Sequence, residues 1–514
     1  MHPTQRRVPL SHRSLRVLVL FLFLALEVKV DSLQAADTLW AGVSKVDITH
    51  PQATSIHDPC FAKALVLKQD QTIVALITVD AVAIGGIGSI RNTFLDAIRT
   101  ELARDPGIPA SNVFINASHC HGQVNPDSEG AVIATVRTAF QHMEPVTAGV
   151  TSAVESRISE NRRVQLKDGT QVDMRRAYAM AWDDQIASVG PIDPQVGILK
   201  LARKDSSTLA VIYNFACHPI MNPPSKGSSA DLIGVASNLI ETAYMRDKTM
   251  AFFIQGCGGD INPVHYKRSD RLPDAEPLGN LLGSTILKAL AKIETKEASL
   301  AVRQRWLSLP RAADFQTRIE SLQSQRSRLV ASLKPTNIQF KQFLPLLIQQ
   351  RFDAVHPSGN AQAYLHASRQ DDPSLAIQDA ENKEQVEAYL ANLQCMEQIT
   401  RLNTNLALLQ MHQAKAEQAL HANLDCELGG LRIGTFRLIT FPGELTSEIG
   451  IHLKKSAPEG TFVAGYTNGY IHYLPTVEQR KNKGFAQEDC DCMVAPEWQR
   501  IFEEAARQLI EDLE

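Results

Sequence analysis

Short apolar runs alternate with amphipathic stretches along residues 40–310 of the chain. Strand-like runs fall at residues 64–67, 73–78, 113–116, 196–201, 209–215 and 251–254, and stretches with helical spacing fall at residues 90–102, 132–143, 239–245 and 278–293. The first two runs flank Asp70-Gln71 and predict a β-hairpin. Strands that alternate with helices predict an α/β fold, here a layered mixed sheet with flanking helices.

Residues 313–423 have a different pattern. Apolar side chains recur there at helical spacing in two long stretches, and the breaker-rich segment His356–Asn360 separates them. This pattern predicts a long helical hairpin inserted into the α/β domain, with its Leu and Met stripe used for packing. The α/β pattern then resumes, with strand-like runs at residues 431–441 and 462–464 and helical spacing at residues 445–453 and 498–513. We therefore expect one α/β domain made of residues 37–312 and 424–514.

The first 36 residues have the composition of a targeting segment. A basic start is followed by the unbroken apolar run Val17–Leu26, and Leu33–Ala36 offers small residues for cleavage. The apolar run is too short to span a bilayer, which takes about 20 residues. Residues 1–36 are therefore expected to be a signal peptide, and the protein to be exported to a periplasmic or extracellular space.

The charge balance argues against a nucleic-acid partner. The chain carries 52 Lys and Arg against 56 Asp and Glu, and residues 1–36 hold five basic and two acidic residues, so the remainder has a net charge of −7. Such a chain does not attract nucleic acid or anionic lipid over long range. We expect at most peripheral membrane contact. The eight cysteines permit disulfides in an exported protein, but their spacing assigns no pairs, and the oligomeric state stays open.

Two histidines one residue apart follow a buried-looking strand, in the segment Ser118-His119-Cys120-His121-Gly122. Alternate residues of an extended segment point the same way, so both imidazoles are expected to face one cavity. Comparable strand-to-loop transitions occur at Tyr213–Pro219, Phe253–Pro263, Thr440–Glu444 and Asn468–Thr476. Open α/β sheets build their sites just beyond strand ends. His119, His218 and Glu444 thus give a two-His, one-carboxylate set that suits zinc with an open position.

These segments resemble the N-terminal catalytic domain of the neutral/alkaline ceramidase family. The resemblance covers residues 40–510, interrupted by the predicted insert, and rests on short motifs in the family's order: Ser118–Gly122, Phe215–His218, Ser228–Ser237, Pro442–Glu444 and Tyr473–Thr476. It implies a zinc ion bound by four ligands, namely His119, His218, Glu444 and Tyr473. The nearby Tyr470 is an alternative to Tyr473.

The resemblance also implies roles for two further side chains. His121 would lie beside the metal and carry a proton. Arg162 would contact the substrate carbonyl or stabilise negative charge, although the adjacent Arg163 is an alternative for that role.

The chain departs from the family pattern at two positions. Gly256 stands where the family has a serine proposed to take part in catalysis, and Phe485 stands where it has a tyrosine. We expect substrate contacts around these positions, from Gly256, Cys257, Asp260, Asn262 and Phe485. Asp260 and Asn262 are equally suited to bracing the Gly-rich turn, and Cys257 is an alternative nucleophile.

Together these features predict an exported zinc-dependent amidohydrolase that cleaves an N-acyl substrate, for which a sphingolipid-like lipid amide is one option. Metal-activated water would be the nucleophile, so no serine is needed. His121 would protonate the leaving amine. Two other functions stay open: a zinc ester hydrolase on the same site, and a non-catalytic binding protein that retains the fold.

Overall fold

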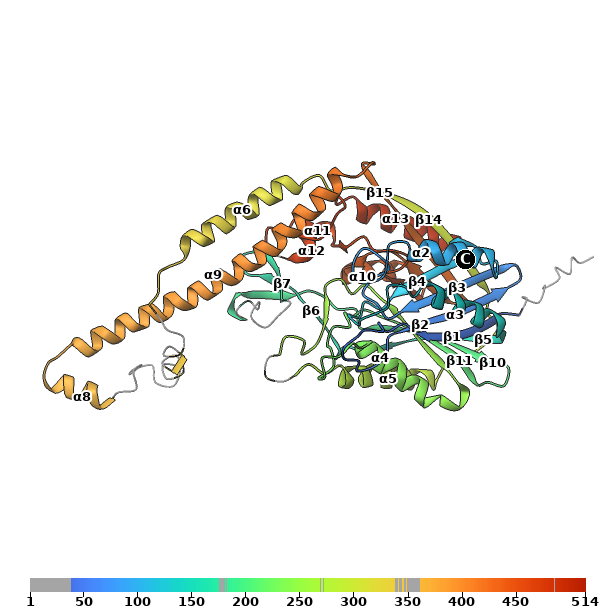
Figure 1. Ribbon diagram of the computed structural model, residues 1–514, viewed down its shortest axis with the longest axis horizontal. Helices are drawn as coiled ribbons and strands as arrows, with labels where there is room; N and C mark the ends of the chain where they lie inside the picture. The colour runs from blue at the N-terminus through green and yellow to red at the C-terminus, as the bar shows by residue number, and fades with distance from the viewer. Residues whose placement is uncertain are drawn as a thin grey trace, which may run out of the picture. The chain divides into compact units, whose positions relative to one another are not determined.

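A mixed eight-stranded sheet is the largest sheet of the protein (Figure 1), with the strand order β12-β11-β10-β5-β1-β2-β3-β4. Neighbouring strands are antiparallel except for the parallel pairs β3–β4 and β11–β12. The strands are β1 (Trp40–Asp47), β2 (Phe61–Gln69), β3 (Thr72–Val79), β4 (Val113–Ala117), β5 (Glu144–Val154), β10 (Gln195–Arg203), β11 (Thr208–Phe215) and β12 (Met250–Gln255). The predicted hairpin around Asp70-Gln71 is the β2–β3 pair.

The computed structural model describes residues 38–174, 181, 183–268, 270, 272–337, 341, 344–345, 348, 361–484 and 486–514. The predicted signal peptide at residues 1–36 and the site position Phe485 lie outside the described residues. Residues Leu39–Glu514 form one unit. No helix among the described residues has the length and apolar character needed to cross a membrane.

A four-stranded sheet packs against the first, with the order β14-β15-β16-β18. Its strands are β14 (Leu300–Pro310), β15 (Asn423–Ile433), β16 (Phe436–Thr440) and β18 (Thr461–Ala464). The single strand predicted at residues 431–441 is wrong, because β15 and β16 form a hairpin there. The chain reverses at Gly434, whose φ of 59° lies in the left-handed region that glycine adopts without strain.

Helices cover the outer faces of the two sheets and give four layers. Helices α2 (Phe94–Arg104) and α3 (Glu129–Gln141) bury apolar side chains against strands β1 to β4, and α4 (Asp231–Ala243) and α5 (Glu276–Leu290) do the same against β10 to β12. Helices α10 (Ser447–Ser456) and α13 (Trp498–Asp512) cover the four-stranded sheet. A separate cluster of buried apolar side chains fills the space between the two sheets. The predicted α/β fold with a layered mixed sheet is confirmed.

The two edge strands of the large sheet, β4 and β12, are hydrogen-bonded to each other through side chains. The backbone N–H of Gln255 donates to Asn116 Oδ1 (2.9 Å), and Gln255 Nε2 donates to the carbonyl oxygens of Ser118 (3.0 Å) and Cys217 (2.8 Å). Strands far apart in the sheet order therefore come together at their carboxyl ends. This closure brings the loops after β4, β11 and β12 to one place.

The remaining elements are short and occur within the segments that connect the longer strands and helices. They are β6 (Ser159–Asn161), β7 (Arg163–Leu166), β8 (Gln171–Asp173), β9 (Ile186–Val189), β13 (Ile261–Pro263), β17 (Glu444–Leu445), β19 (Tyr473–Leu474), α11 (Val477–Arg480), α12 (Gln487–Cys490) and the 3-10 turns η1 (Ala110–Asn112), η3 (Asp183–Gln185) and η4 (Met245–Asp247). The parallel pair β17–β19 matters most for the site.

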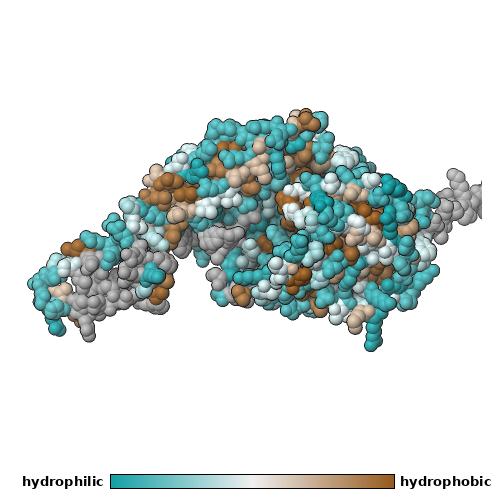
Figure 2. All heavy atoms as spheres, in the orientation of Figure 1, coloured by the Kyte–Doolittle hydropathy of each residue, from teal (hydrophilic) through white to brown (hydrophobic). Residues whose placement is uncertain are grey.

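The predicted helical hairpin is formed mainly by α6 (Phe315–Ser332) and the long helix α9 (Ser374–Glu417), with α8 (Ala361–Arg369) between them. An apolar cluster joins its base to the domain and includes Phe315, Leu402, Leu409 and Cys490. Large apolar side chains are exposed farther along α9, namely Ile377, Leu390, Leu393 and Met396. Figure 2 shows hydrophobic surface on the hairpin.

Candidate metal centre

Three strand ends bring the candidate metal ligands together. His119 follows β4, His218 follows β11, and Glu444 begins β17 just after β16. All three side chains are buried, and their potential ligand atoms lie within 4.8 Å of one another. His119 Nε2 is 3.7 Å and His218 Nε2 is 3.3 Å from Glu444 Oε2. The structure therefore forms the two-His, one-carboxylate set from residues that are distant in the sequence.

Backbone carbonyl groups orient both imidazoles. The Nδ1 atom of His119 lies 2.6 Å from the carbonyl oxygen of Val82, and that of His218 lies 2.6 Å from the carbonyl oxygen of Gly258. A carbonyl oxygen only accepts, so each Nδ1 carries the proton and each Nε2 keeps its lone pair toward Glu444. His119 also has a φ of 66°, a backbone strain typical of functional sites.

The protonation states suit metal binding. Burial lowers the pKa of His119 to about 4, with Glu444 opposing and His218 adding to the shift. Burial alone would raise the pKa of Glu444, but the adjacent His119 and His218 hold it well below its usual range. At neutral pH the site thus presents neutral imidazoles and an ionised carboxylate, the forms in which these side chains bind metal ions.

Two tyrosines hold Glu444: Tyr466, which the sequence did not point to, and Tyr470, which it offered only as an alternative to Tyr473. Tyr466 donates its hydroxyl hydrogen to Glu444 Oε2 (3.1 Å) and packs its ring 4.5 Å from the ring of His119, and Tyr470 donates to Glu444 Oε1. Both hydroxyls keep their protons because burial raises the pKa of each. The sequence signal for them was the close spacing of Tyr466, Tyr470 and Tyr473 in one short segment.

Tyr473 lies beside Glu444, since the two residues are register partners in the parallel β17–β19 pair. Its hydroxyl oxygen accepts a hydrogen bond from Arg162 Nη2 (3.1 Å), and its side chain lines the cavity described below. Tyr470 instead contacts the carboxylate of Glu444. The geometry therefore gives these two tyrosines different neighbours.

Arg162 is almost fully buried and lies in a dense polar network. Its Nε donates to Glu488 Oε1 (2.7 Å), its Nη1 to Asn262 Oδ1 (3.2 Å) and its Nη2 to the carbonyl oxygen of Gly259 (2.5 Å) as well as to Tyr473. The adjacent Arg163 points to Asp489 instead. Arg162, rather than Arg163, is the arginine that lines the candidate site.

The three candidate ligands open onto a cavity of about 380 Å³. His121 also lines it, remains exposed to solvent, and places its ring 5.5 Å from the ring of His119. Desolvation and the neighbouring His119 lower the pKa of His121 to about 4. Polar side chains that include His472 and Asp491 also line the cavity. The apolar part of the wall includes two side chains from helix α9: Val82, Ile87, Ile220, Leu408 and Met411. Helix α9 thus contributes directly to the cavity.

Four other positions that we expected to contact substrate are not among the described residues that line this cavity. Gly256 lies where an added Cβ would be 3.1 Å from main-chain atoms of Phe215. Cys257 is buried against Gly450 of α10, and burial raises the pKa of its thiol well above the usual value. Asp260 accepts hydrogen bonds from Ser447 and Asn161, so it braces the turn, as Asn262 does through Arg162.

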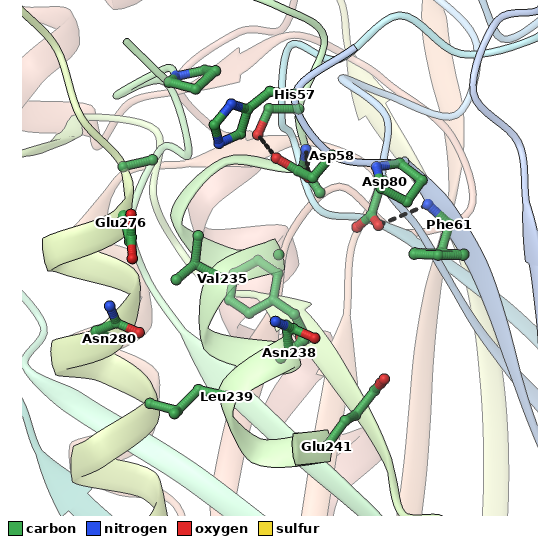
Figure 3. A pocket seen from close by; sticks show the side chains of 18 of the residues that line it. His57, Asp58, Phe61, Asp80, Val235, Asn238, Leu239, Glu241, Glu276 and Asn280 are labelled. Atoms are coloured by element: carbon green, nitrogen blue, oxygen red, sulfur yellow. Dashed lines mark hydrogen bonds between the residues drawn. The ribbon is translucent and has the colours of Figure 1, made fainter. Parts of the chain in front are cut away.

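A larger cavity of about 600 Å³ lies beside helices α4 and α5 (Figure 3). Lys45 and Lys63 in its lining both form ion pairs with Glu241. Burial raises the pKa of Asp80, which also lines it, to about 6. None of the sets of three metal-ligating side chains found among the described residues lies in this cavity. The smaller cavity therefore holds the candidate chemistry.

Comparisons with known proteins bear on the fold. No protein-family model matches the sequence, and a search of curated proteins found no match. Among solved structures, neutral ceramidase from Pseudomonas aeruginosa aligns with a TM-score of 0.57 at 16% identity, covering 93% of this chain and 75% of that chain. A structure of a ceramidase complexed with C2 aligns with a TM-score of 0.56 at 16% identity, covering 93% and 74%.

The chain therefore has a neutral ceramidase-like fold, as the sequence motifs indicated. At this level of identity the likeness establishes the arrangement of the chain. The chemistry of the site depends on its own residues.

Proposed function

We propose that this protein is an exported zinc-dependent hydrolase that cleaves the amide bond of an N-acyl substrate. One observation carries the proposal: His119, His218 and Glu444 present two neutral imidazole nitrogens and one carboxylate oxygen to a common point in a cavity. The ceramidase-like fold adds support, because the two solved structures that align with the chain are ceramidases.

The donor atoms fit zinc. Ligand atoms bonded to a tetrahedral zinc ion at about 2.0–2.1 Å lie about 3.3 Å apart. The separations of 3.3 and 3.7 Å between Glu444 Oε2 and the two imidazole Nε2 atoms are close to that value. Hydrogen bonds from Nδ1 to backbone carbonyl oxygens are the usual outer contacts of metal-binding histidines. His119, His218 and Glu444 would hold the ion, with Tyr473 as the fourth ligand.

Zinc bound there would supply a Lewis acid that polarises a carbonyl group and lowers the pKa of water. Side chains of the protein would stabilise charge and transfer protons. Arg162 directs a guanidinium donor at the Tyr473 oxygen and so favours negative charge at that edge of the cavity. His121, neutral at pH 7 and exposed in the cavity, is placed to accept a proton and deliver it to a leaving amine.

The cavity wall favours a substrate with an apolar part. Leu408 and Met411 of the insert face the same space as Ile87 and Ile220. A lipid amide would place its polar amide at the ligands and its hydrocarbon against these side chains. We propose a lipid amide as the substrate class on this basis.

A substrate panel with metal analysis tests the proposal. Purified protein would be assayed for release of fatty acid and amine from N-acyl compounds, and for release of alcohol from matched esters, with and without chelator. We expect about one zinc per chain and chelator-sensitive amide cleavage, both lost in Glu444→Gln and retained in His142→Ala, which changes an exposed histidine on the surface. Faster ester cleavage would favour an ester hydrolase, and zinc without turnover of any substrate would favour a binding protein.

Export is proposed from residues 1–36 and has its own test. The full chain would be expressed in a secreting host, and the exported product would be sequenced from its N-terminus. We expect cleavage near Ala36; product retained inside the cell with its N-terminus intact would contradict export.

A further inference from the structure

A second group of ionisable side chains, three of them buried, links the insert to the loop that carries Tyr473. We name the four residues His412, Lys415, His472 and Asp491 the α9 clamp. His412 Nε2 lies 2.7 Å and His472 Nδ1 lies 3.0 Å from Asp491 Oδ1, and Lys415 Nζ lies 3.3 Å from His472 Nε2. Two members come from helix α9 and two from the C-terminal part of the α/β domain.

The α9 clamp has the geometry of a hydrogen-bonded network. Its nitrogen–oxygen separations of 2.7 and 3.0 Å are hydrogen-bond lengths, shorter than the roughly 3.3 Å expected between ligands of one zinc ion. The Lys415 ammonium is within hydrogen-bonding distance of the free nitrogen of His472, where it would repel a cation. Lys415 and Asp491 also balance in charge. The group is therefore suited to joining protein segments.

The clamp is directly connected to the candidate metal ligands. His472 precedes Tyr473, its carbonyl oxygen accepts from the backbone N–H of Glu444 (2.9 Å), and the backbone N–H of Tyr473 donates to the carbonyl oxygen of Asp491 (3.0 Å). His472 has a φ of 63°, in the left-handed region that residues other than glycine adopt uncommonly. The ring of Tyr470, which binds Glu444, lies 5.0 Å from the ring of His472.

One face of α9 contacts both the metal cavity and the clamp residues His472 and Asp491. Residues three and four apart lie on the same face of a helix, so Leu408, Met411, His412 and Lys415 form one strip. Leu408 and Met411 line the metal cavity, while His412 and Lys415 bind the loop beside it. His412 also stacks on Phe315 of α6, which ties both long helices to the clamp.

We propose that the α9 clamp makes the insert a positioning element of the metal centre, holding the β19 loop so that Tyr473 and Glu444 keep their ligand geometry. His412, Asp491 and Lys415 are positioning residues, which act through His472 on the ligands. This inference rests on the proposed function, because it concerns the same metal site. It explains how a hairpin far from β4 and β11 in sequence takes part in that site.

The test uses the full chain loaded with zinc or with cobalt(II), whose visible absorption reports the coordination geometry. The variants are His412→Ala, His412→Gln, Asp491→Asn and Lys415→Met, and the control is His366→Ala, which removes an exposed histidine from the same hairpin. Zinc affinity would be measured by competition with a chromogenic chelator, and folding by circular dichroism.

We expect His412→Ala and Asp491→Asn to weaken zinc binding about 10–100-fold and to change the cobalt spectrum, as loss of an outer partner of a ligand does. His412→Gln retains a donor toward Asp491 and should recover part of the affinity. Lys415→Met, at an exposed position, should show a smaller change without loss of fold, so it tests the inference even if His412→Ala fails to fold. His366→Ala should match the parent.

Two results would overturn the inference. Unchanged zinc affinity and cobalt spectrum in the folded clamp variants would show that the clamp does not position the ligands. A second equivalent of metal in the parent, lost in His412→Ala, would show that the clamp is itself a metal site. A parent that binds no metal would instead overturn the proposed function, and this inference with it.

Discussion

Glu444 and Tyr473 lie side by side as register partners of two parallel strands, although a helix and several loops separate them in the sequence. The backbone fixes this relationship, because the N–H of Glu444 donates to the carbonyl oxygen of His472, the residue before Tyr473. A carboxylate and a phenol oxygen are thereby presented from one short ladder.

His121 and Cys257 are the two candidates for a direct role next to the metal ligands, and their variants should differ. His121→Ala is expected to lower kcat about 10²–10⁴-fold and to change the pH profile, because it removes the exposed proton carrier of the cavity. Cys257→Ala should keep most of the activity, since the thiol is buried and its pKa is raised by burial. Steady-state kinetics over a pH series checks both. An acyl adduct trapped on Cys257 would reverse this assignment.

The stability of the metal-free protein should depend on pH through His119. Its native pKa is about 4, against 6.5 for an unperturbed histidine, so between these values the unfolded chain binds a proton that the native protein does not. The contribution of His119 to the free energy of unfolding is therefore fully present above pH 6.5. It is lost as the pH falls toward 4 and amounts to roughly 3 kcal/mol. Urea unfolding over that range measures the slope.

His119→Gln provides the control for that measurement, because it removes the titrating group and should flatten the slope. The lowered pKa of His121 acts in the same direction, so part of the slope should remain. Equal stability of the parent at about pH 4 and about pH 7 would contradict a buried neutral His119.

The Arg162–Glu488 pair should separate stability from function. Arg162→Met removes the shorter of the two arginine ion pairs of the buried Glu488 carboxylate and is expected to destabilise the protein by about 3–5 kcal/mol. Adding Glu488→Gln removes the buried charge and should restore part of the stability. Zinc affinity should stay low in both variants, because neither restores the hydrogen bond to the Tyr473 oxygen. Thermal melting and metal titration of the single and double variants give the answer, and recovery of metal binding in the double variant would argue against this role of Arg162.

The distal half of the insert should be dispensable. The backbone N–H of Lys334 donates to Asn392 Oδ1 (3.0 Å), and Asn392 Nδ2 donates to the carbonyl oxygen of Lys334 (2.7 Å). The chain can therefore be rejoined there. Removing residues 336–390 and adding a short Gly-Ser linker should leave cooperative melting and zinc binding intact.

Removal of all residues 313–423 is the matched comparison. It deletes His412 and exposes Cys490, which packs on Phe315 and Leu402 in the same apolar cluster. We expect this variant to lose zinc affinity and stability. Equal behaviour of the two deletions would show that the base of the hairpin contributes nothing to the site.

The candidate ligands could be found from the sequence because each one directly follows a short apolar run. His119, His218 and Glu444 come after β4, β11 and β16, and polar residues at strand ends are the local signal for a site in this class of fold. The β2–β3 hairpin was predictable for the same reason, since Asp70-Gln71 separates two strongly apolar runs. Such signals depend only on neighbouring residues in the sequence, so they can be recognised without knowing which segments pack together.

Strands with mixed exposure were not predicted. Most side chains of strand β14 are half-buried or exposed, and β5 is rich in small and polar residues, so neither gives a clear apolar run. Each is stabilised by its neighbours, β15 for β14 and β10 for β5, and these pairings join distant segments. Propensity within one strand does not contain that information.

The sequence by itself determined the fold class and the chemical identity of the candidate ligands, because both follow from local pattern and residue type. Tertiary structure alone decided which side chains surround them. Tyr466 and Tyr470 reach Glu444, and His412 reaches Asp491, only after the sheet edges close and α9 packs on the domain. Contacts of this kind depend on the relative position of whole elements, which side-chain packing fixes and no single segment encodes.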